Sequence, residues 1–172
     1  TYLNPGNDMF QISTNGDVYV DKTGVIEQTN LLLNTPGRYI CISRPRRFGK
    51  STAAYMLAAY YGRGCILRDR GYTADDQKKY LDFIRNLLKD KAYVALAYMT
   101  GILPVKKYGT HSALNMFTEY SMTSPRFFAE YIGFTETEVR ELCARYDIDF
   151  DMMQSWYDGY FFPETGHVYN PK

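Results

Sequence analysis

The segment 38–61 constrains the fold more than any other part of this sequence. Arg38-Tyr-Ile-Cys-Ile-Ser43 is nearly all apolar and rich in β-forming residues, which is typical of a strand buried on both faces. After a short loop, the run from Lys50 to Tyr61 is rich in Ala, Met and Leu and predicts a helix, which Gly62-Arg-Gly64 ends. A buried strand followed closely by a helix predicts an α/β fold with a parallel sheet.

The loop between this strand and helix, Arg44-Pro-Arg-Arg-Phe-Gly-Lys-Ser51, resembles a phosphate-binding turn. The Walker A pattern begins with a Gly and ends in Gly-Lys-Ser/Thr, and here Arg44 occupies the position of the first Gly. Gly49 allows the backbone to approach phosphate oxygens closely, Lys50 suits the β and γ phosphates, and Ser51 suits Mg²⁺. We therefore expect Mg-ATP to bind at Arg46, Arg47, Phe48, Gly49, Lys50, Ser51 and Thr52, with Ser51 as the metal-binding residue.

Two other interpretations of this loop stay open. It can be an ordinary strand-to-helix turn whose Arg and Lys side chains are solvated. The three arginines Arg44, Arg46 and Arg47 can also bind phosphates bidentately, or receive an acidic group of a partner.

Around this centre, apolar spacing and turn residues predict the other elements of the first half. Residues 1–16 predict an irregular lead-in, and Asp17-Val-Tyr-Val20 predicts a short strand. Asp21 and Lys22 are typical of a turn. Helices are expected at Val25–Leu33 and Ala74–Lys91, and a buried strand is expected at Ala92–Met99.

The second half predicts short helices separated by turns from Leu114 onward. Thr135-Glu-Thr-Glu138 forms a capping box that begins a helix running to about Tyr146. A helix at 149–157 and a β-hairpin at 161–169 follow, and the block Trp156-Tyr-Asp-Gly-Tyr160 is expected to pack that helix against the hairpin. The architecture predicted is an abbreviated P-loop NTPase-like parallel sheet over 17–101, a helical region to 158 and a closing hairpin, divided as a nucleotide-binding region 1–101 and a helical region 102–172.

Several blocks along the chain resemble the predicted AAA-ATPase-like family of bacteria and archaea, in that family's order. They are Tyr19-Val-Asp-Lys-Thr-Gly24, Ser43-Arg-Pro-Arg-Arg-Phe-Gly-Lys-Ser51, Tyr98-Met-Thr-Gly-Ile-Leu-Pro104, Ser112-Ala-Leu-Asn115, Gly133-Phe-Thr-Glu-Thr-Glu138 and Trp156-Tyr-Asp-Gly-Tyr160. The resemblance explains Arg44, because Arg-Pro-Arg-Arg-Phe-Gly-Lys-Ser is that family's form of the loop. It also implies a nuclease domain after the ATPase part. Since this chain stops at Lys172, such a domain, or another protein partner, is expected on another chain.

The acidic strand that such ATPases use to hold Mg²⁺ and polarise water is not found in the sequence. Too few residues follow Tyr61 to hold it, so we expect a deletion and doubtful hydrolysis of ATP. The resemblance identifies 92–99 as the sensor strand with Thr100 as the sensor residue, so strands 38–43 and 92–99 are expected to pair directly and leave an exposed edge. Asp69 is a candidate for the missing carboxylate, although capping the helix at 74–91 also explains it.

Composition excludes several classes of function. Basic and acidic residues number 20 and 19, so nothing global favours nucleic acid, and a nucleic-acid fragment using Arg44–Arg47 is disfavoured. Cys41, Cys65 and Cys143 are odd in number and widely spaced, which indicates a reduced, cytoplasmic setting without disulfides or metal. No apolar run has the ~20 residues of a membrane span. The main alternative to ATP binding is a non-catalytic protein-interaction module derived from a P-loop ATPase.

Overall fold

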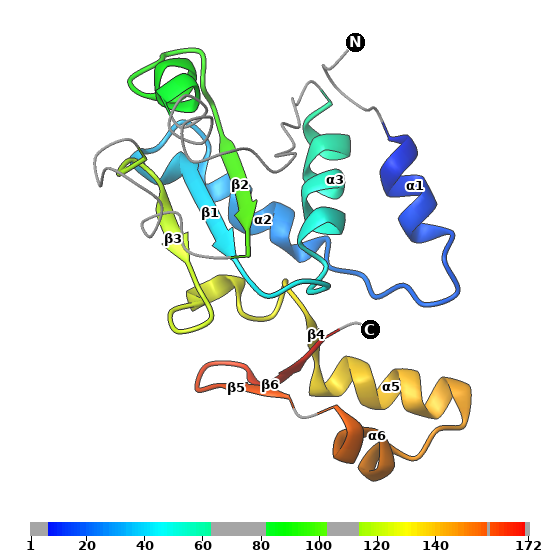
Figure 1. The fold of residues 1–172 in the computed structure, drawn as a ribbon. Coiled ribbons are helices and arrows are strands. Elements are labelled where there is room, and N and C mark those ends of the chain that lie inside the picture. The colour runs from blue at the N-terminus through cyan, green and yellow to red at the C-terminus, as the bar shows by residue number, and fades with distance from the viewer. Residues whose placement is uncertain (1–6, 63–81, 103–113, 158, 171–172) are drawn as a thin grey trace.

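Two small sheets of different kind organise the chain (Figure 1). The computed structural model describes residues 7–62, 82–102, 114–157 and 159–170. The elements of the first sheet and its helices are α1 (Asp8–Thr14), α2 (Gly24–Leu32), η1 (Pro36–Arg38), β1 (Tyr39–Ser43), α3 (Lys50–Tyr61), β2 (Ala97–Gly101), β3 (Thr118–Tyr120) and η3 (Arg126–Phe128). Those of the second are β4 (Phe134–Thr135), α5 (Glu136–Tyr146), α6 (Phe150–Trp156), β5 (Tyr160–Phe162) and β6 (Gly166–Tyr169).

The first sheet is parallel, with strand order β2-β1-β3. Tyr39 of β1 pairs with Ala97, and Ile40 pairs with Thr118 on the other side. All five residues of β1 are buried, as the apolar run 38–43 predicts. The direct pairing of the strand at 39–43 with the strand at 97–101 is confirmed, and β2 forms one edge of the described sheet.

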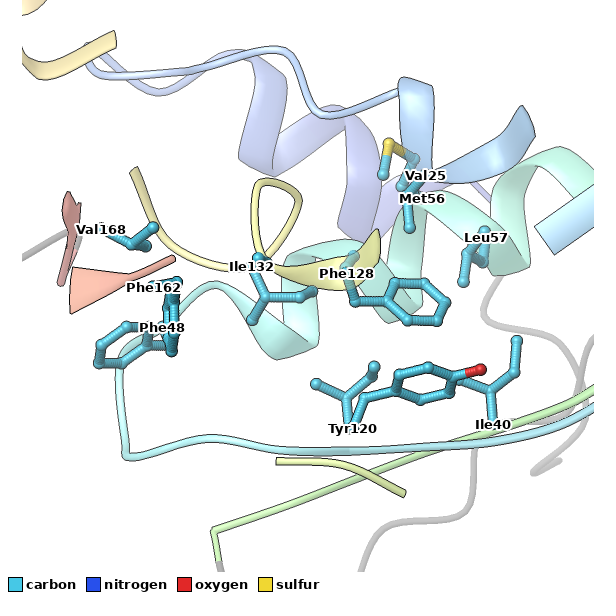
Figure 2. Packing of buried hydrophobic residues seen from close by; sticks show 13 residues of the cluster. Val25, Ile40, Phe48, Met56, Leu57, Tyr120, Phe128, Ile132, Phe162 and Val168 are labelled. Carbon is cyan, nitrogen blue, oxygen red and sulfur yellow. The ribbon is translucent and has the colours of Figure 1, made fainter. Parts of the chain in front are cut away.

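Each face of β1 supports its own core cluster, because successive side chains of a strand point to opposite faces. On one face, Ile40 and Ile42 pack with Met56 and Leu57 of α3 and with Val25 of α2 (Figure 2). On the other face, Tyr39 and Cys41 pack with residues that follow α3, among them Ile84, Val94 and Phe117. Ile84 belongs to a helical stretch at 82–88, so helices cover both faces of the sheet.

The second sheet is antiparallel, with order β4-β6-β5, and α5 and α6 pack on one of its faces (Figure 1). Its inner face joins the main core through Phe162 and Val168, which lie with Phe48 at one end of the cluster in Figure 2. Its outer face contributes Tyr169 to a smaller cluster with Val139 and Cys143 of α5. The hairpin at 161–169 and the helices at 136–146 and 150–156 are thereby confirmed.

Local signals predicted the ends of several helices correctly. The helix predicted at Lys50–Tyr61 has those bounds, and Gly62 ends it in the left-handed region at φ 70°. The capping box at the start of α5 is confirmed, because the Glu138 amide donates to Thr135 Oγ1 and Glu138 Oε2 accepts from the Thr135 amide. Of the helix predicted at 74–91, residues 82–88 are helical, residues 89–91 are not, and residues 74–81 lie outside the described residues.

Four predictions about the elements were wrong. Residues 8–14 form helix α1 and not an irregular lead-in, because α1 packs against α3 and Phe10 contacts the core. Residues 17–20 form no strand, since no neighbouring strand pairs with them. The strand predicted at 92–99 begins only at Ala97. The region after Leu114 is not only helical, because residues 118–120 add β3 to the parallel sheet.

The expectation for Trp156 was also wrong. Its side chain is 77% exposed and does not pack α6 against the hairpin; Phe150 and Met153 do so on Tyr169. No described helix is long and apolar enough to cross a bilayer. The division at residue 101 stays a prediction, and the sheet takes strands from both sides of it.

Candidate functional site

The loop 44–49 leaves the carboxyl end of β1 and leads directly into α3. Two of its residues have left-handed backbones, Arg47 at φ 70° and Gly49 at φ 72°. A side chain at Gly49 would have space, because no atom lies within 4 Å of the position of its Cβ. Glycine is therefore favoured at 49 by its backbone conformation, which turns the chain into the helix.

The N-terminus of α3 presents amide groups that the helix itself leaves unpaired. The N-cap residue is Gly49, and no side chain caps this end of the helix. The first amides of a helix have no partner inside the helix, and the helix dipole makes this end positive. Such an end is suited to an anion.

The side chain of Lys50 lies across the loop that precedes it. Its ammonium donates to the carbonyl oxygen of Pro45 at 2.6 Å. Burial, and then the nearby guanidinium of Arg44, lower the pKa of Lys50. Two cations therefore lie close together beside an uncapped helix N-terminus, an arrangement that an anion would stabilise.

Arg44 has a role in the structure that the sequence did not reveal. Its side chain is fully buried, so the interpretation of Arg44 as a solvated or freely binding arginine was wrong. One terminal nitrogen donates to the carbonyls of Ser43 and Tyr120, at 3.2 and 3.1 Å, and the guanidinium lies 5.6 Å from the ring centre of Phe162. Burial lowers the pKa of Arg44 to about 10, which leaves it protonated at neutral pH. Arg44 thus joins the ends of β1 and β3 beneath the loop.

The other residues expected to bind the nucleotide divide into exposed and buried ones. Arg46, Arg47 and Ser51 are exposed, and Thr52 is half-buried. The Arg46 carbonyl accepts from Asn170 Nδ2 at 3.3 Å, so the second sheet contacts the loop. Phe48 is fully buried, with its ring edge-on to Tyr160 at 5.4 Å, so its side chain belongs to the core and only its backbone lies on the loop.

The two residues proposed for the acidic and sensor positions have different outcomes. Thr100 pairs with Ile42 near the carboxyl end of β2, and the next residue, Gly101, accepts a 3.1 Å hydrogen bond from the Arg44 amide. The structure therefore brings Thr100 to the same edge of the sheet as the loop. Asp69, and the deletion proposed after Tyr61, lie outside the described residues.

A carboxylate that the sequence analysis did not single out lies beside the start of the loop. Ser43 Oγ donates to Glu119 Oε1 at 2.9 Å across the β1–β3 pairing. Glu119 is half-buried. Burial, and then the nearby charge of Glu119, raise the pKa of Cys41 to about 12. The run Phe117-Thr-Glu-Tyr120, which has three β-favouring residues and is followed by turn residues, is the signal that would have indicated this strand.

A cavity of about 290 Å³ opens next to Gly49 and Thr52. Three separate segments enclose it: residues 10–22, residues 48–56 and residues 131–134. Most of the side chains around it are aromatic or aliphatic, including Phe10, Tyr19, Met56, Tyr131 and Phe134. The site therefore combines a polar loop at a helix N-terminus with an adjacent, mainly apolar space.

Lys22 is the main charged side chain at this cavity. Its ammonium forms an ion pair with Glu138, at 2.7 and 2.6 Å from the two carboxylate oxygens, and donates to the Glu130 carbonyl at 2.5 Å. Burial lowers the pKa of Lys22. The sequence analysis treated Lys22 only as part of a turn, and the turn itself is present, since Asp21 accepts from the Thr23 amide at 2.8 Å.

These features define a class of α/β protein in which the candidate site lies where parallel strands end and a helix begins. Within that class, a family model described as "Predicted AAA-ATPase" matches residues 6–70, a segment that contains α1, α2, β1, the loop and α3. The match covers less than half of the 172 residues. No curated protein and no solved structure matches the chain.

Proposed function

We propose that this chain is a P-loop module of the AAA-ATPase-like kind that binds Mg-ATP between the 44–52 loop and the adjoining cavity. The observation that carries the proposal is the arrangement of β1, the loop and α3. A buried parallel strand ends in a turn with left-handed Gly49, and an uncapped helix begins beside a lysine. The family match over 6–70 supports the same conclusion.

The residues present fit a polyphosphate. The ammonium of Lys50 now donates to a carbonyl of its own loop, so it has a hydrogen bond that a phosphate oxygen can replace. Burial, and then the guanidinium of buried Arg44, lower the pKa of Lys50, so a phosphate bound here would lie beside two cations. The amides that begin α3 would hold phosphate oxygens, and Ser51, which is exposed, would hold Mg²⁺.

The adjoining cavity would hold the base and ribose. It borders Gly49 and Thr52, which lie at the start of α3, so a ligand bound at the loop extends into it. Aromatic and aliphatic side chains such as Tyr19, Met56 and Phe134 suit a flat heterocycle. The open cavity beside the loop is a space that a nucleotide could occupy, which supports nucleotide binding over the alternative of a non-catalytic interaction module.

Hydrolysis needs a carboxylate near the attacking water. Glu119 is a candidate because it contacts Ser43, the residue immediately before the loop. Its hydrogen bond is to Ser43 rather than to Ser51, so we propose binding of ATP as the primary activity and leave Glu119 to be tested. Thr100, at the same edge of the sheet, is proposed as the sensor residue.

The test is a calorimetric titration of the protein with Mg-ATP. Lys50→Ala removes a charge-assisted hydrogen bond and should weaken binding about 10- to 100-fold. Arg145→Ala is the control, because Arg145 is exposed in the last turn of α5 and its loss removes the same charge away from the loop. If the wild type does not bind Mg-ATP, or if both variants bind as it does, the proposal is wrong. Phosphate release from wild type and Glu119→Gln decides the role of Glu119.

A further inference from the structure

The second sheet and its helices expose several large apolar side chains. Trp156, Phe161 and Met152 are 77%, 64% and 63% exposed, and Ile148 and Tyr157 are about half exposed. We call these five residues the 148–161 surface. Single exposed apolar residues are common on proteins, whereas several that are close together mark interaction sites.

Three of these residues, Met152, Trp156 and Phe161, belong to elements on one side of the second sheet. Met152 and Trp156 are one turn apart on α6. Helix α6 covers the face of the sheet that carries Tyr169, because Gln154 Nε2 donates to the Tyr169 hydroxyl at 3.2 Å and Phe150 contacts the same ring. Phe161 lies on that face as well, since it pairs with His167, two residues before Tyr169.

The apolar side chains of this surface do not contribute to the core of the second sheet. Phe150 and Met153, the inward residues of α6, already pack against Tyr169, and Phe162 fills the inner face of β5. Met152 and Trp156 therefore remain on the outside of a helix whose packing is complete without them. Such residues are available to bind a partner.

The segment 146–171 carries charge of one sign, and the nearby Arg140 of α5, which stacks on Phe150, is paired with Glu136. From residue 146 to residue 171 the sequence has five acidic residues and no Lys or Arg, although the whole chain carries a formal charge of +1. The acidic residues Asp147, Asp149, Asp151 and Glu164 are exposed. The 148–161 surface is thus apolar with an acidic border.

We propose that the 148–161 surface binds a basic amphipathic helix of another protein. Met and Trp provide adaptable apolar contacts for the apolar face of such a helix, and the surrounding carboxylates complement its Lys and Arg side chains. None of the five residues of this surface belongs to the loop 44–52 or lines the adjoining cavity, so the proposal is tested without ATP. A partner of this kind agrees with the expectation of a protein partner from the sequence.

The test uses fluorescence anisotropy of a labelled synthetic Leu–Lys peptide that forms an amphipathic helix. An otherwise identical Leu–Glu peptide and a scrambled Leu–Lys peptide are the ligand controls. We expect the protein to bind the Leu–Lys helix, more weakly at high salt, and not to bind the two controls. Equal binding of all three peptides would overturn the proposal.

Variants localise the binding. Trp156→Ala and Asp151→Lys should each weaken binding about tenfold or more, and circular dichroism should show folded proteins because both residues are exposed. Leu31→Ala is the matched control, since Leu31 is 73% exposed on α2. Equal binding by wild type and both surface variants contradicts the proposal. Concentration-dependent dimers that Trp156→Ala abolishes would also contradict it, because the occupant would then be a second copy of the chain.

Discussion

Substitution of Lys22 should separate the energy of an ion pair from that of a helix cap, because Glu138 takes part in both. Glu138 forms the ion pair with Lys22 and, at 2.8 Å, accepts from the amide of Thr135 at the start of α5. Lys22→Met removes the ion pair and the hydrogen bond to the Glu130 carbonyl, and leaves the cap in place. Glu138→Gln removes the charge but keeps a side chain that suits a capping box, and Thr135→Ala weakens the cap alone.

The expected magnitudes follow from burial. The side chains of Lys22 and Glu138 are 14% and 22% exposed, so this ion pair is partly buried. Exposed ion pairs contribute about 0–1 kcal/mol to stability, and breaking a fully buried pair costs about 3–5 kcal/mol, so we expect a value between these two ranges. We expect Lys22→Met and Glu138→Gln each to lower the free energy of unfolding by about 2 kcal/mol. The double variant should lose clearly less than the sum, and Thr135→Ala about 1 kcal/mol.

The measurement is urea unfolding of the four variants followed by far-ultraviolet circular dichroism. Additive losses in the double variant would refute the reasoning, because they would mean that the two side chains do not interact in solution. A loss in Lys22→Met no larger than about 0.5 kcal/mol would refute it as well, since that is the value of an ordinary surface change.

The dependence on pH gives this prediction a second readout. Burial lowers the pKa of Lys22 in the folded state below its ordinary value of 10.5, so the unfolded chain binds more protons between these two values. The stability linked to Lys22 is therefore present above pH 10.5 and is lost as the pH falls through its folded-state pKa. The difference in unfolding free energy between wild type and Lys22→Met should increase as the pH rises through this window, and a decrease would contradict the cause assigned to the shift.

Two further predictions concern positions in the core. Gly133→Ala should destabilise the protein by at least about 2 kcal/mol in urea unfolding, because φ is 109° and the added Cβ would lie 2.6 Å from Val168 Cγ1. Gly62→Ala, where the Cβ meets no atom within 4 Å, is the control and should cost only about 1 kcal/mol. Cys41, whose pKa is about 12, should react with iodoacetamide roughly 1,000-fold more slowly in the folded than in the unfolded protein near neutral pH, as peptide mass spectrometry would show; similar rates would contradict its burial.

The parts of the fold that the sequence predicted well depend on neighbours in the chain. The end of α3 at Gly62 and the capping box at Thr135 are fixed by residues within one helical turn. The buried run at 39–43 needed only its apolar composition. Such patterns involve only residues that are close together in the sequence, so the boundaries of these helices and strands can be predicted from the sequence.

The elements that the sequence analysis missed depend on distant partners. The three residues of β3 form a strand because they pair with β1, some 76 residues earlier, as in the contact between Ser43 and Glu119. Helix α1 has no strong periodic pattern and is held by packing on α3. Residues 17–20 have a β-like composition but no pairing strand, and a strand needs a partner for its backbone hydrogen bonds.

The candidate site was likewise predicted only where it depends on residues close together in the sequence. The position of the loop, of Gly49 and of Lys50 at the start of α3 followed from the local motif. The cavity did not, because its walls come from three segments that the fold brings together. The Lys22–Glu138 pair joins residues 116 positions apart, which no periodicity indicates.

Because Arg44 is buried, its presence at the position of the first Gly of the Walker A pattern has a structural explanation. A glycine at this position would leave the space beneath the loop empty, whereas Arg44 fills it and donates to the carbonyls of Ser43 and Tyr120. The same guanidinium lowers the pKa of Lys50, so the residue that fixes the loop also increases the positive charge beside it. Structural support and attraction for an anion thus come from one side chain, and the substitution of Gly by Arg is compatible with a phosphate-binding role for the loop.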